Sequence, residues 1–371
     1  MMKRTPLYDW HKAHGARLVP FAGWEMPLQY EGAGPITEHQ LVRRSAGLFD
    51  VSHMGRFDVQ GAKAAEFLDS LLSSGIAGIE DFQSKYALLC REDGGILDDV
   101  FVYRRAADWY LVVVNASNLD KDFSWFTRHA GAFQADAEVR DVSAENAMIA
   151  FQGPLALDVL GKCVQDFTPP RRFFFTPYTL ADADCLVART GYTGEDGVEI
   201  FAPADKAAAV CDTLLKAGAA WDIEAGPAGL AARDSLRFEA GFPLYGHELS
   251  EDVTPIEAGV LWACDLAKPF IGRDAILARK SEGPKKKLVT FVMVEKSVAR
   301  EGYAVTDEAG EAIGEVASGM LAPTLTAFAG NAFVRSDYAK PGRTFYISIR
   351  GAGKKAQVVK RPLYVPAYRK L

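Results

Sequence analysis

The sequence lacks any run that approaches the ~20 apolar residues needed to span a membrane as a helix. The start of the chain, MMKRTPLYDWHKAHGARLVPFAGWEMP, has early basic residues but no continuous apolar segment of the kind found in signal peptides. We therefore expect a cytoplasmic protein that has no membrane partner.

Excess positive charge is also lacking, because 42 lysine and arginine residues are outnumbered by 48 aspartate and glutamate residues, a formal net charge of -6. A nucleic-acid binder needs a concentrated basic surface, so nucleic acid is not an expected partner.

Cysteine is scarce: the five cysteines form no CxxC pair and no ligand-like cluster with the six histidines. This pattern favours reduced thiols over disulfides and predicts no metal site.

Several common catalytic motifs are absent as well. The chain contains no GxSxG, no GKS or GKT phosphate-binding loop, and no GxGxxG that opens a helix after a strand. His53, in DVSHMG, is a single histidine near a turn, which is more typical of a satisfied structural residue than of a general base. These absences disfavour hydrolase, kinase and dinucleotide-dependent functions.

The length of 371 residues exceeds one ordinary core and predicts two or three domains. Alternating helix and strand patterns fill 61–129 and recur over 146–219. Between Gly226 and Gly241, the sequence predicts about 12 helical residues that begin near Pro227. The charged stretch RKSEGPKKK is typical of a solvated link, and the short strands with glycine turns that follow predict a small all-β domain.

Two adjacent aspartates stand in the predicted strand GGILDDVFVY, residues 94–103, where a buried charge is costly. Side chains alternate across a strand, so Asp98 and Asp99 must lie on opposite faces. A hairpin loop of two or four residues centred on Asp93 and Gly94 would place residue 99 opposite residue 88. A three-residue loop would swap the faces.

With the even-length loop, the face that carries Asp99 also carries a set of large apolar and aromatic residues, namely Tyr86, Leu88, Leu97, Phe101 and Tyr103. The other face carries Ile96, Asp98, Val100 and Val102. An aromatic wall with one carboxylate suits a flat heteroaromatic ligand. The alternative is that one aspartate caps a neighbouring loop while the other is exposed to solvent.

Glu199 and Arg233 are further candidates. Glu199 follows the glycine-rich turn of RTGYTGEDGVEI, where it either accepts two parallel N–H bonds from an amidine-like edge or is an exposed strand glutamate. Arg233 and Arg237 are four residues apart on one face of the predicted helix. They either form salt bridges with acidic neighbours or hold a guanidinium for a ligand carboxylate or for Glu199.

Five stretches, in this order, closely resemble the T-protein of the glycine cleavage system, an aminomethyltransferase family: KRTPLYDWHKAHGARLVPFAGWEMPLQY, GLFDVSHMG, GGILDDVFVY, RTGYTGEDGVEI and AGLAARDSLRFEAGFPLYGHE. The resemblance implies an α+β fold in a three-domain, cloverleaf-like arrangement, with two N-terminal α+β folate-binding units that contain antiparallel sheets, and a small C-terminal β-barrel. The expected boundaries are 1–55 with 140–250 for the first, discontinuous unit, 56–139 for the second, 251–280 for a connecting segment and 281–371 for the barrel.

The resemblance also implies a reaction. A lipoyl arm on the H-protein delivers an aminomethyl group, ammonia leaves, and the one-carbon unit passes to the co-substrate tetrahydrofolate as 5,10-methylenetetrahydrofolate. By its place in the LDD motif, Asp99 matches the family's catalytic aspartate. The positions that match folate or substrate contacts of the family are Tyr86, Tyr103, Asn115, Met54, Tyr192, Glu199, Arg233 and Tyr368. Arg233 would either position Glu199 or meet the glutamate tail of the folate.

Two related functions are the alternatives. One is a folate-dependent demethylase of the same superfamily, and the other is a non-catalytic folate-binding protein. The presence of both LDD and GYTGEDG favours the lipoyl-dependent transferase, and the KGCYxGQE motif of the non-catalytic relatives is absent. The sequence leaves open the oligomeric state, the H-protein docking surface and the preferred length of the folate polyglutamate tail.

Overall fold

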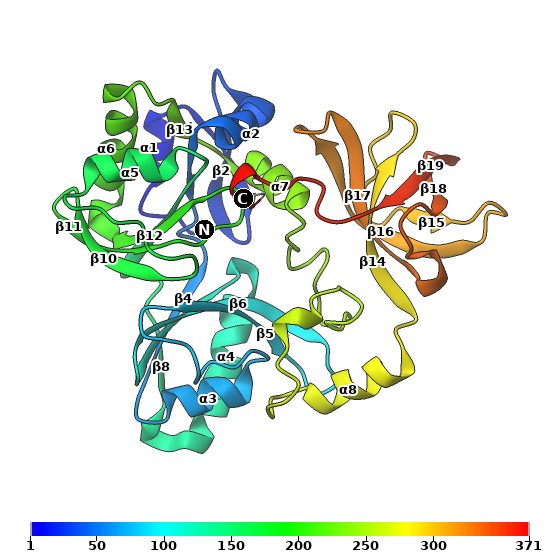
Figure 1. Ribbon diagram of the computed structural model, residues 1–371, viewed down its shortest axis with the longest axis horizontal. Helices are drawn as coiled ribbons and strands as arrows, with labels where there is room; N and C mark the ends of the chain where they lie inside the picture. The colour runs from blue at the N-terminus through cyan, green and yellow to red at the C-terminus, as the bar shows by residue number, and fades with distance from the viewer. Residues whose placement is uncertain (1, 370–371) are drawn as a thin grey trace.

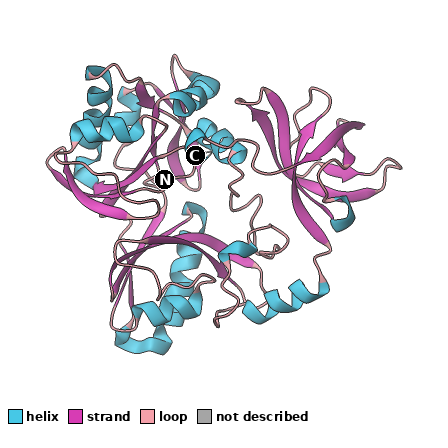
Figure 2. Ribbon diagram, viewed as in Figure 1, coloured by secondary structure: helices cyan, strands magenta, loops and turns pink. Residues whose placement is uncertain are grey.

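The computed structural model, which describes residues 2–369, has three lobes, and helix α7, Leu230–Glu239, lies between the first lobe and the third (Figure 1). Two lobes combine helices with a sheet, and the third consists almost entirely of strands (Figure 2). This confirms the expected α+β class with a C-terminal barrel. Within these residues, no helix is long and apolar enough to cross a membrane.

The first lobe contains a six-stranded sheet whose strand order is β10 (Phe175–Leu180), β11 (Ala183–Ala188), β12 (Gly197–Pro203), β9 (Asn146–Gln152), β3 (Ala46–Asp50) and β13 (Ala225–Pro227). The pairs within it are antiparallel except β13 with β3, which is parallel. The other elements of this lobe are α1 (Tyr8–Ala13), β1 (Ala16–Phe21), β2 (Trp24–Tyr30), α2 (Gly34–Arg44), α5 (Ala156–Cys163) and α6 (Ala207–Ala220). Apolar residues of α5 and α6 pack on one sheet face and form its core.

The second lobe contains a five-stranded antiparallel sheet in the order β5 (Ser84–Cys90), β6 (Ile96–Ala106), β7 (Trp109–Val114), β4 (Gly55–Gln60) and β8 (Glu138–Asp141). One face of this sheet is covered by α3 (Ala64–Leu71) and α4 (Leu119–Ala130). The apolar spacing of both helices explains why they pack there, because it places their apolar side chains on one stripe.

The third lobe is a closed barrel in the order β14 (Lys286–Met293), β17 (Ala327–Arg335), β16 (Ala312–Ala322), β15 (Ala304–Thr306), β18 (Thr344–Ile349) and β19 (Ala352–Val359). Helix α8, Arg273–Glu282, leads into it from the second lobe (Figure 1). Alternate strand residues fill the barrel interior, as closure of a small sheet requires.

The two α+β lobes meet through a shared apolar layer. Phe49, Ala150 and Phe201 of the first sheet are buried with Tyr103 and Leu111 of the second. The face of β6 that carries Tyr103 therefore points toward the first sheet. This contact brings acidic side chains of two different sheets into one region of the molecule.

Two local expectations are wrong in part. The helix predicted from Pro227 begins at Leu230, because Pro227 instead continues β13, where it lies opposite Leu48 of β3. The charged stretch predicted as a solvated link is divided between two elements: its first part ends α8 and its last lysines begin β14. In both cases tertiary packing extends regular structure into residues whose local pattern indicates a helix start or a loop.

Candidate active site

Asp99 lies on β6 in the predicted register. It pairs with Leu88, and Tyr86 pairs with Phe101. The Tyr86 hydroxyl donates to Asp99 Oδ2 over 3.0 Å, and the Asn115 side-chain amide donates to Asp99 Oδ1 over 2.8 Å. The structure therefore brings three of the predicted site residues into direct contact around one partly exposed carboxylate.

A β-bulge at Leu97 produces this register. Cys90 pairs with Ile96, whereas Leu89 pairs with Asp98, so Leu97 is an extra residue on β6. The predicted faces are therefore wrong for the two residues before the aspartates. Leu97 packs in the core beneath α3 and α4, and Ile96 packs on the opposite side.

The two adjacent aspartates have different surroundings. Asp98 is fully buried and accepts hydrogen bonds from the Asn115 backbone N–H at 2.9 Å and from the Asn118 amide at 2.6 Å. The Asn115 amide also contacts Asp98 and so bridges both carboxylates. The alternative interpretation is thus half correct: Asp98 caps the loop after β7, but Asp99 is held by hydrogen bonds and is not free in solvent.

The environment of Asp99 opposes its ionisation. Burial, followed by the negative charge of Asp98, raises the pKa of Asp99 to about 7, and hydrogen bonds from Tyr86 and Asn115 oppose this rise. A carboxyl group in this range can exchange a proton near neutral pH.

An aromatic wall connects Asp99 to Glu199. The ring centroids of Tyr86 and Phe101 are 6.2 Å apart, and those of Phe101 and Tyr103 are 5.6 Å apart. The Tyr103 hydroxyl donates to Glu199 Oε2 over 3.2 Å. Glu199 is buried, with a 7% exposed fraction, so the alternative of an exposed strand glutamate is wrong.

Arg233 and Arg237 have different roles despite their shared helix. Arg237 forms buried or half-buried ion pairs with Asp234 and Glu248, each at 2.8 Å. The Arg233 guanidinium lies over the Tyr192 ring, 4.8 Å from its centroid, and its Nη1 is buried without a hydrogen-bond partner in residues 2–369. Burial lowers the pKa of Arg233, and the nearby charge of Glu199 opposes this.

Tyr192 and the two outlying predicted residues are fixed by other contacts. The Tyr192 hydroxyl donates to the Pro243 carbonyl oxygen. Met54 packs at the edge of the apolar layer between the sheets. The Tyr368 hydroxyl donates to the Gly194 carbonyl over 2.8 Å, so the end of the chain touches the glycine-rich turn. Within the described residues, neither Met54 nor Tyr368 forms a side-chain hydrogen bond to Asp99 or Glu199.

Two residues near the site are not among the predicted ones. The ring of Trp262 stacks on Tyr86 at 5.3 Å although the tryptophan is 72% exposed. The Thr190 hydroxyl donates to Glu199 Oε2 over 2.5 Å, and its place in the glycine-rich motif is a signal that the sequence contains. Trp262 has no such signal, because it approaches Tyr86 from a distant part of the chain.

His53 departs from its expected structural role. It is buried, and its Nδ1 has no partner in the described part of the chain. Burial lowers the pKa of His53 to about 4, while the Asp50 charge opposes the shift. The ring is therefore neutral at physiological pH, and the expectation of a satisfied histidine is not met at Nδ1.

Known proteins are similar to this chain over its whole length. A family model described as the GCVT N-terminal domain matches residues 7–268, and the glycine cleavage T-protein C-terminal barrel domain matches 286–364. An aminomethyltransferase of Caldanaerobacter subterraneus is 42% identical and covers 100% of this chain and 98% of its own length. An aminomethyltransferase of Alkaliphilus oremlandii is 43% identical and covers 100% of this chain and 99% of its own length.

A solved structure agrees with these relatives. The crystal structure of the glycine cleavage system aminomethyltransferase T from Bartonella henselae is 34% identical, covers 99% of each chain and superposes with a TM-score of 0.91. These matches support the transferase over the demethylase and the non-catalytic folate-binding protein. The chain therefore belongs to the glycine cleavage T-protein family of aminomethyltransferases.

Proposed function

We propose that this chain transfers the one-carbon unit of an aminomethyl group from the lipoyl arm of the H-protein to tetrahydrofolate, with Asp99 as the catalytic residue. The observation that carries the proposal is the junction of two sheets at which Asp99 and Glu199 are joined by the Tyr86–Phe101–Tyr103 wall. One carboxylate is available for the reacting atoms and the other for the far edge of a flat ring.

The residues present suit a reduced folate. Both hydroxyl donors to Glu199 reach Oε2, so Oε1 accepts no hydrogen bond from residues 2–369 and is available to the N–H edge of a pterin. The unpartnered Nη1 of Arg233 is a buried donor that a ligand oxygen would satisfy. The aromatic wall supplies area on which a ring can pack. In this proposal Tyr192, Asn115, Met54 and Tyr368 complete or support the folate site.

Asp99 would stabilise the positive charge that develops during the transfer and would help to move protons. Transfer breaks the bonds from carbon to sulfur and to ammonia, and it forms two bonds from carbon to folate nitrogens. The protons of those nitrogens go to the thiol and to ammonium. Positive charge builds near the carbon, and the Asp99 carboxylate, held by Tyr86 and Asn115, would stabilise it without reorientation. Its raised pKa also suits it to move a proton.

The proposal includes the partner, the compartment and the domains. The lipoylated H-protein is the proposed donor. The five cysteines are unpaired in the described chain, which supports a cytoplasmic location because reducing compartments keep thiols free. We place the folate-binding units at 1–55 with 140–250 and at 56–139, the connecting segment at 251–280 and the barrel at 281–371. The two sheets and the closed barrel support this division, except that β8, Glu138–Asp141, crosses the proposed boundary between residues 139 and 140.

Replacement of Asp99 by asparagine tests the proposal. We expect Asp99→Asn to lower the formation of methylenetetrahydrofolate from aminomethylated H-protein by about 10² to 10⁴, because the fixed charge is lost while the shape is kept. Folate affinity, measured by calorimetry, should stay close to that of the wild type. Wild-type kcat/KM should also fall as the pH drops below about 7, because protonation of Asp99 removes the charge.

Asp108→Asn is the matched control, since Asp108 is an exposed aspartate in the turn between β6 and β7. It should leave both the rate and the pH profile unchanged. Turnover of Asp99→Asn near the wild-type rate, or an unchanged acidic limb in its pH profile, would contradict the catalytic assignment.

A further inference from the structure

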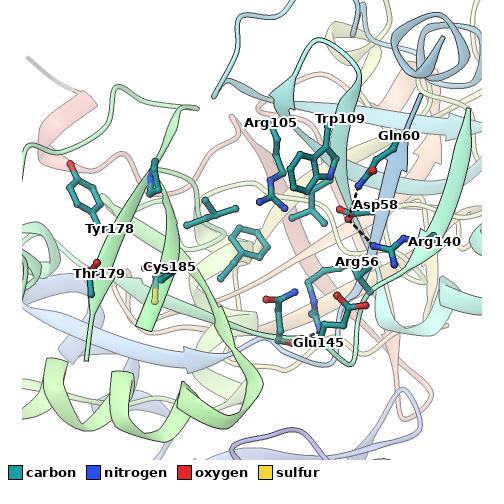
Figure 3. Close-up of a pocket in the computed structure, with 17 residues that line it drawn as sticks. Arg56, Asp58, Gln60, Arg105, Trp109, Arg140, Glu145, Tyr178, Thr179 and Cys185 are labelled. Carbon is teal, nitrogen blue, oxygen red and sulfur yellow. Dashed lines mark hydrogen bonds and ion pairs between the residues drawn. The ribbon is translucent and has the colours of Figure 1, made fainter. Parts of the chain in front are cut away.

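A cavity of about 760 Å³ lies between the two α+β lobes, away from Asp99 (Figure 3). One wall comes from β4, β7 and β8 of the second sheet, and the other from β10 and β11 of the first. The volume falls within the range of small-molecule sites, roughly 300–1,000 Å³. None of the nine proposed active-site residues lines it.

Three residues that line the cavity contain buried polar atoms that lack hydrogen-bond partners in the described part of the chain. Arg56 has an exposed fraction of 1% and Asp58 of 6%, yet Arg56 Nε and Asp58 Oδ1 form no hydrogen bond within residues 2–369. The indole N–H of Trp109 is a third such atom. A buried polar group without a partner costs about 1–3 kcal/mol, so the wall contains two donors and one acceptor that a bound molecule would satisfy.

Hydrogen bonds from the two terminal nitrogens of Arg56 hold its Nε in place. Its two terminal nitrogens donate to backbone carbonyls on both sides of the junction, including those of Met54 at 2.7 Å and Asn146 at 3.0 Å. These hydrogen bonds fix the orientation of the Arg56 side chain. The remaining N–H is therefore preorganised rather than mobile.

The cavity also contains a cation on an aromatic platform. The Arg105 guanidinium lies over the Trp109 ring, 3.7 Å from its centroid, and forms no ion pair with a carboxylate of the described residues. By contrast, Arg140 lies 3.5 Å from Asp58 Oδ2. Figure 3 shows Arg105 and Trp109 directed toward the space between the walls. A free guanidinium beside a ring favours an anionic group attached to a planar one.

A packed layer separates this cavity from the active site. Phe201 lines the cavity and contacts Tyr103 edge to face, with centroids 5.2 Å apart. The Tyr103 hydroxyl in turn bonds Glu199 on the other side. A molecule in the cavity would thus lie at the opposite end of the same inter-sheet interface from Glu199.

We propose that this cavity is a second binding site, for a planar nitrogen heterocycle that carries an anionic group. The heterocycle places an N–H against Asp58 Oδ1 and acceptor atoms against Arg56 Nε and the Trp109 indole N–H. The anion pairs with Arg105. A guanine nucleotide has this arrangement of an N–H edge, a carbonyl acceptor and a phosphate. This inference does not depend on the proposed transfer reaction.

Calorimetric titration of the full chain with GMP tests the site. We expect GMP to bind with a Kd below about 1 mM, a free energy that the contacts with three charged side chains and one neutral indole N–H can supply. Guanosine, which lacks the anion, and ribose 5-phosphate, which lacks the ring, should each bind at least about tenfold more weakly. No heat with GMP at millimolar concentration, or equal affinity for either fragment, would overturn the proposal.

Variants locate the binding. Arg105→Gln and Asp58→Asn should each weaken GMP binding by roughly tenfold or more. Arg128→Gln is the matched control, because Arg128 also lies over a tryptophan ring, that of Trp125, but does not line the cavity. It should leave GMP affinity unchanged. Thermal unfolding of each variant confirms that it is folded, and GMP binding that Arg105→Gln leaves intact in a folded protein would refute the site.

Discussion

Asp99 and Glu199 show how an acidic residue in a strand can be held by side-chain hydrogen bonds while it is partly or wholly withdrawn from bulk water. Asp99 accepts from Tyr86 and Asn115, and Glu199 accepts from Tyr103 and Thr190. Each hydrogen bond to a charged group contributes about 1.5–3 kcal/mol, which offsets part of the cost of burial. In both cases the donors are side chains from other strands or loops, so the acidic residue and its partners must be assembled together.

At this residue scale, Glu199→Gln should weaken tetrahydrofolate binding by roughly ten- to a hundredfold, because a neutral amide accepts the N–H bonds of a pterin edge more weakly than a carboxylate does. The measurement is calorimetric titration, with circular dichroism as a check that the fold is kept. Glu138→Gln is the control, since Glu138 is an exposed strand glutamate of β8. Unchanged affinity in Glu199→Gln would remove its proposed role.

At the scale of elements, β6 and the start of α4 are connected through buried polar residues. The bulge at Leu97 allows Asp99 to face the aromatic wall while Asp98 points toward the start of α4. There Asp98 meets Asp122, which is fully buried on α4. Burial, followed by the charge of Asp98, raises the pKa of Asp122 well above its ordinary range, so Asp122 keeps its proton.

This pair predicts a pH-dependent stability. In the unfolded chain Asp122 loses its proton near pH 3.9, but in the folded chain it keeps it, so its contribution favours folding at low pH and is lost progressively as the pH rises from about 4. Asp122→Asn keeps a donor and removes the ionisation. The variant should therefore gain stability relative to the wild type as the pH rises, by at most about 1.4 kcal/mol per pH unit.

Urea unfolding at pH 5 and pH 8 measures this difference. Asp120→Asn, an exposed aspartate in the same helical turn, should show little change between the two pH values. A stability difference between Asp122→Asn and the wild type that is the same at both pH values would show that Asp122 is ionised in the folded protein.

At the scale of the whole molecule, buried polar contacts attach the barrel to the first lobe. Glu248 accepts from Arg237 of α7 at 2.8 Å and from the Asn331 amide of β17 at 2.8 Å. Glu239 of α7 accepts from the Thr324 hydroxyl at 2.6 Å and pairs with Arg43 at 3.1 Å. The helix that carries Arg233 is therefore fixed from both sides, which connects the arrangement of the lobes to the geometry of the active site.

Glu248→Ala should destabilise the protein by about 3–5 kcal/mol, because it removes the only fully buried carboxylate that pairs with Arg237 in the described residues and leaves the half-exposed Asp234. Urea unfolding at neutral pH measures the loss. The matched control is Glu224→Ala, which removes an exposed pair with Arg44 and should cost less than about 1 kcal/mol. Similar losses for the two variants would mean that the buried pair does not hold the lobes together.

Periodicity and motif order were sufficient to predict the α+β class, the separate all-β end of the chain and the family. Strand alternation also predicted that Tyr86, Asp99, Phe101 and Tyr103 share a face, because these residues are neighbours on one hairpin. Such predictions rest on local geometry that every strand repeats. They failed at Leu97 and Ile96, since nothing in the local pattern indicates a bulge.

The sequence by itself therefore determined which residue types are available and how they alternate along each strand. Only the tertiary structure decided that Glu199 is buried against Tyr103 and that Trp262 stacks on Tyr86. It also decided that Arg233 Nη1 has no hydrogen-bond partner among residues 2–369, while Arg237 forms two ion pairs. The physical reason is that hydrogen bonds and burial depend on distances between residues far apart in the chain, and these distances are set by the packing of whole sheets and helices.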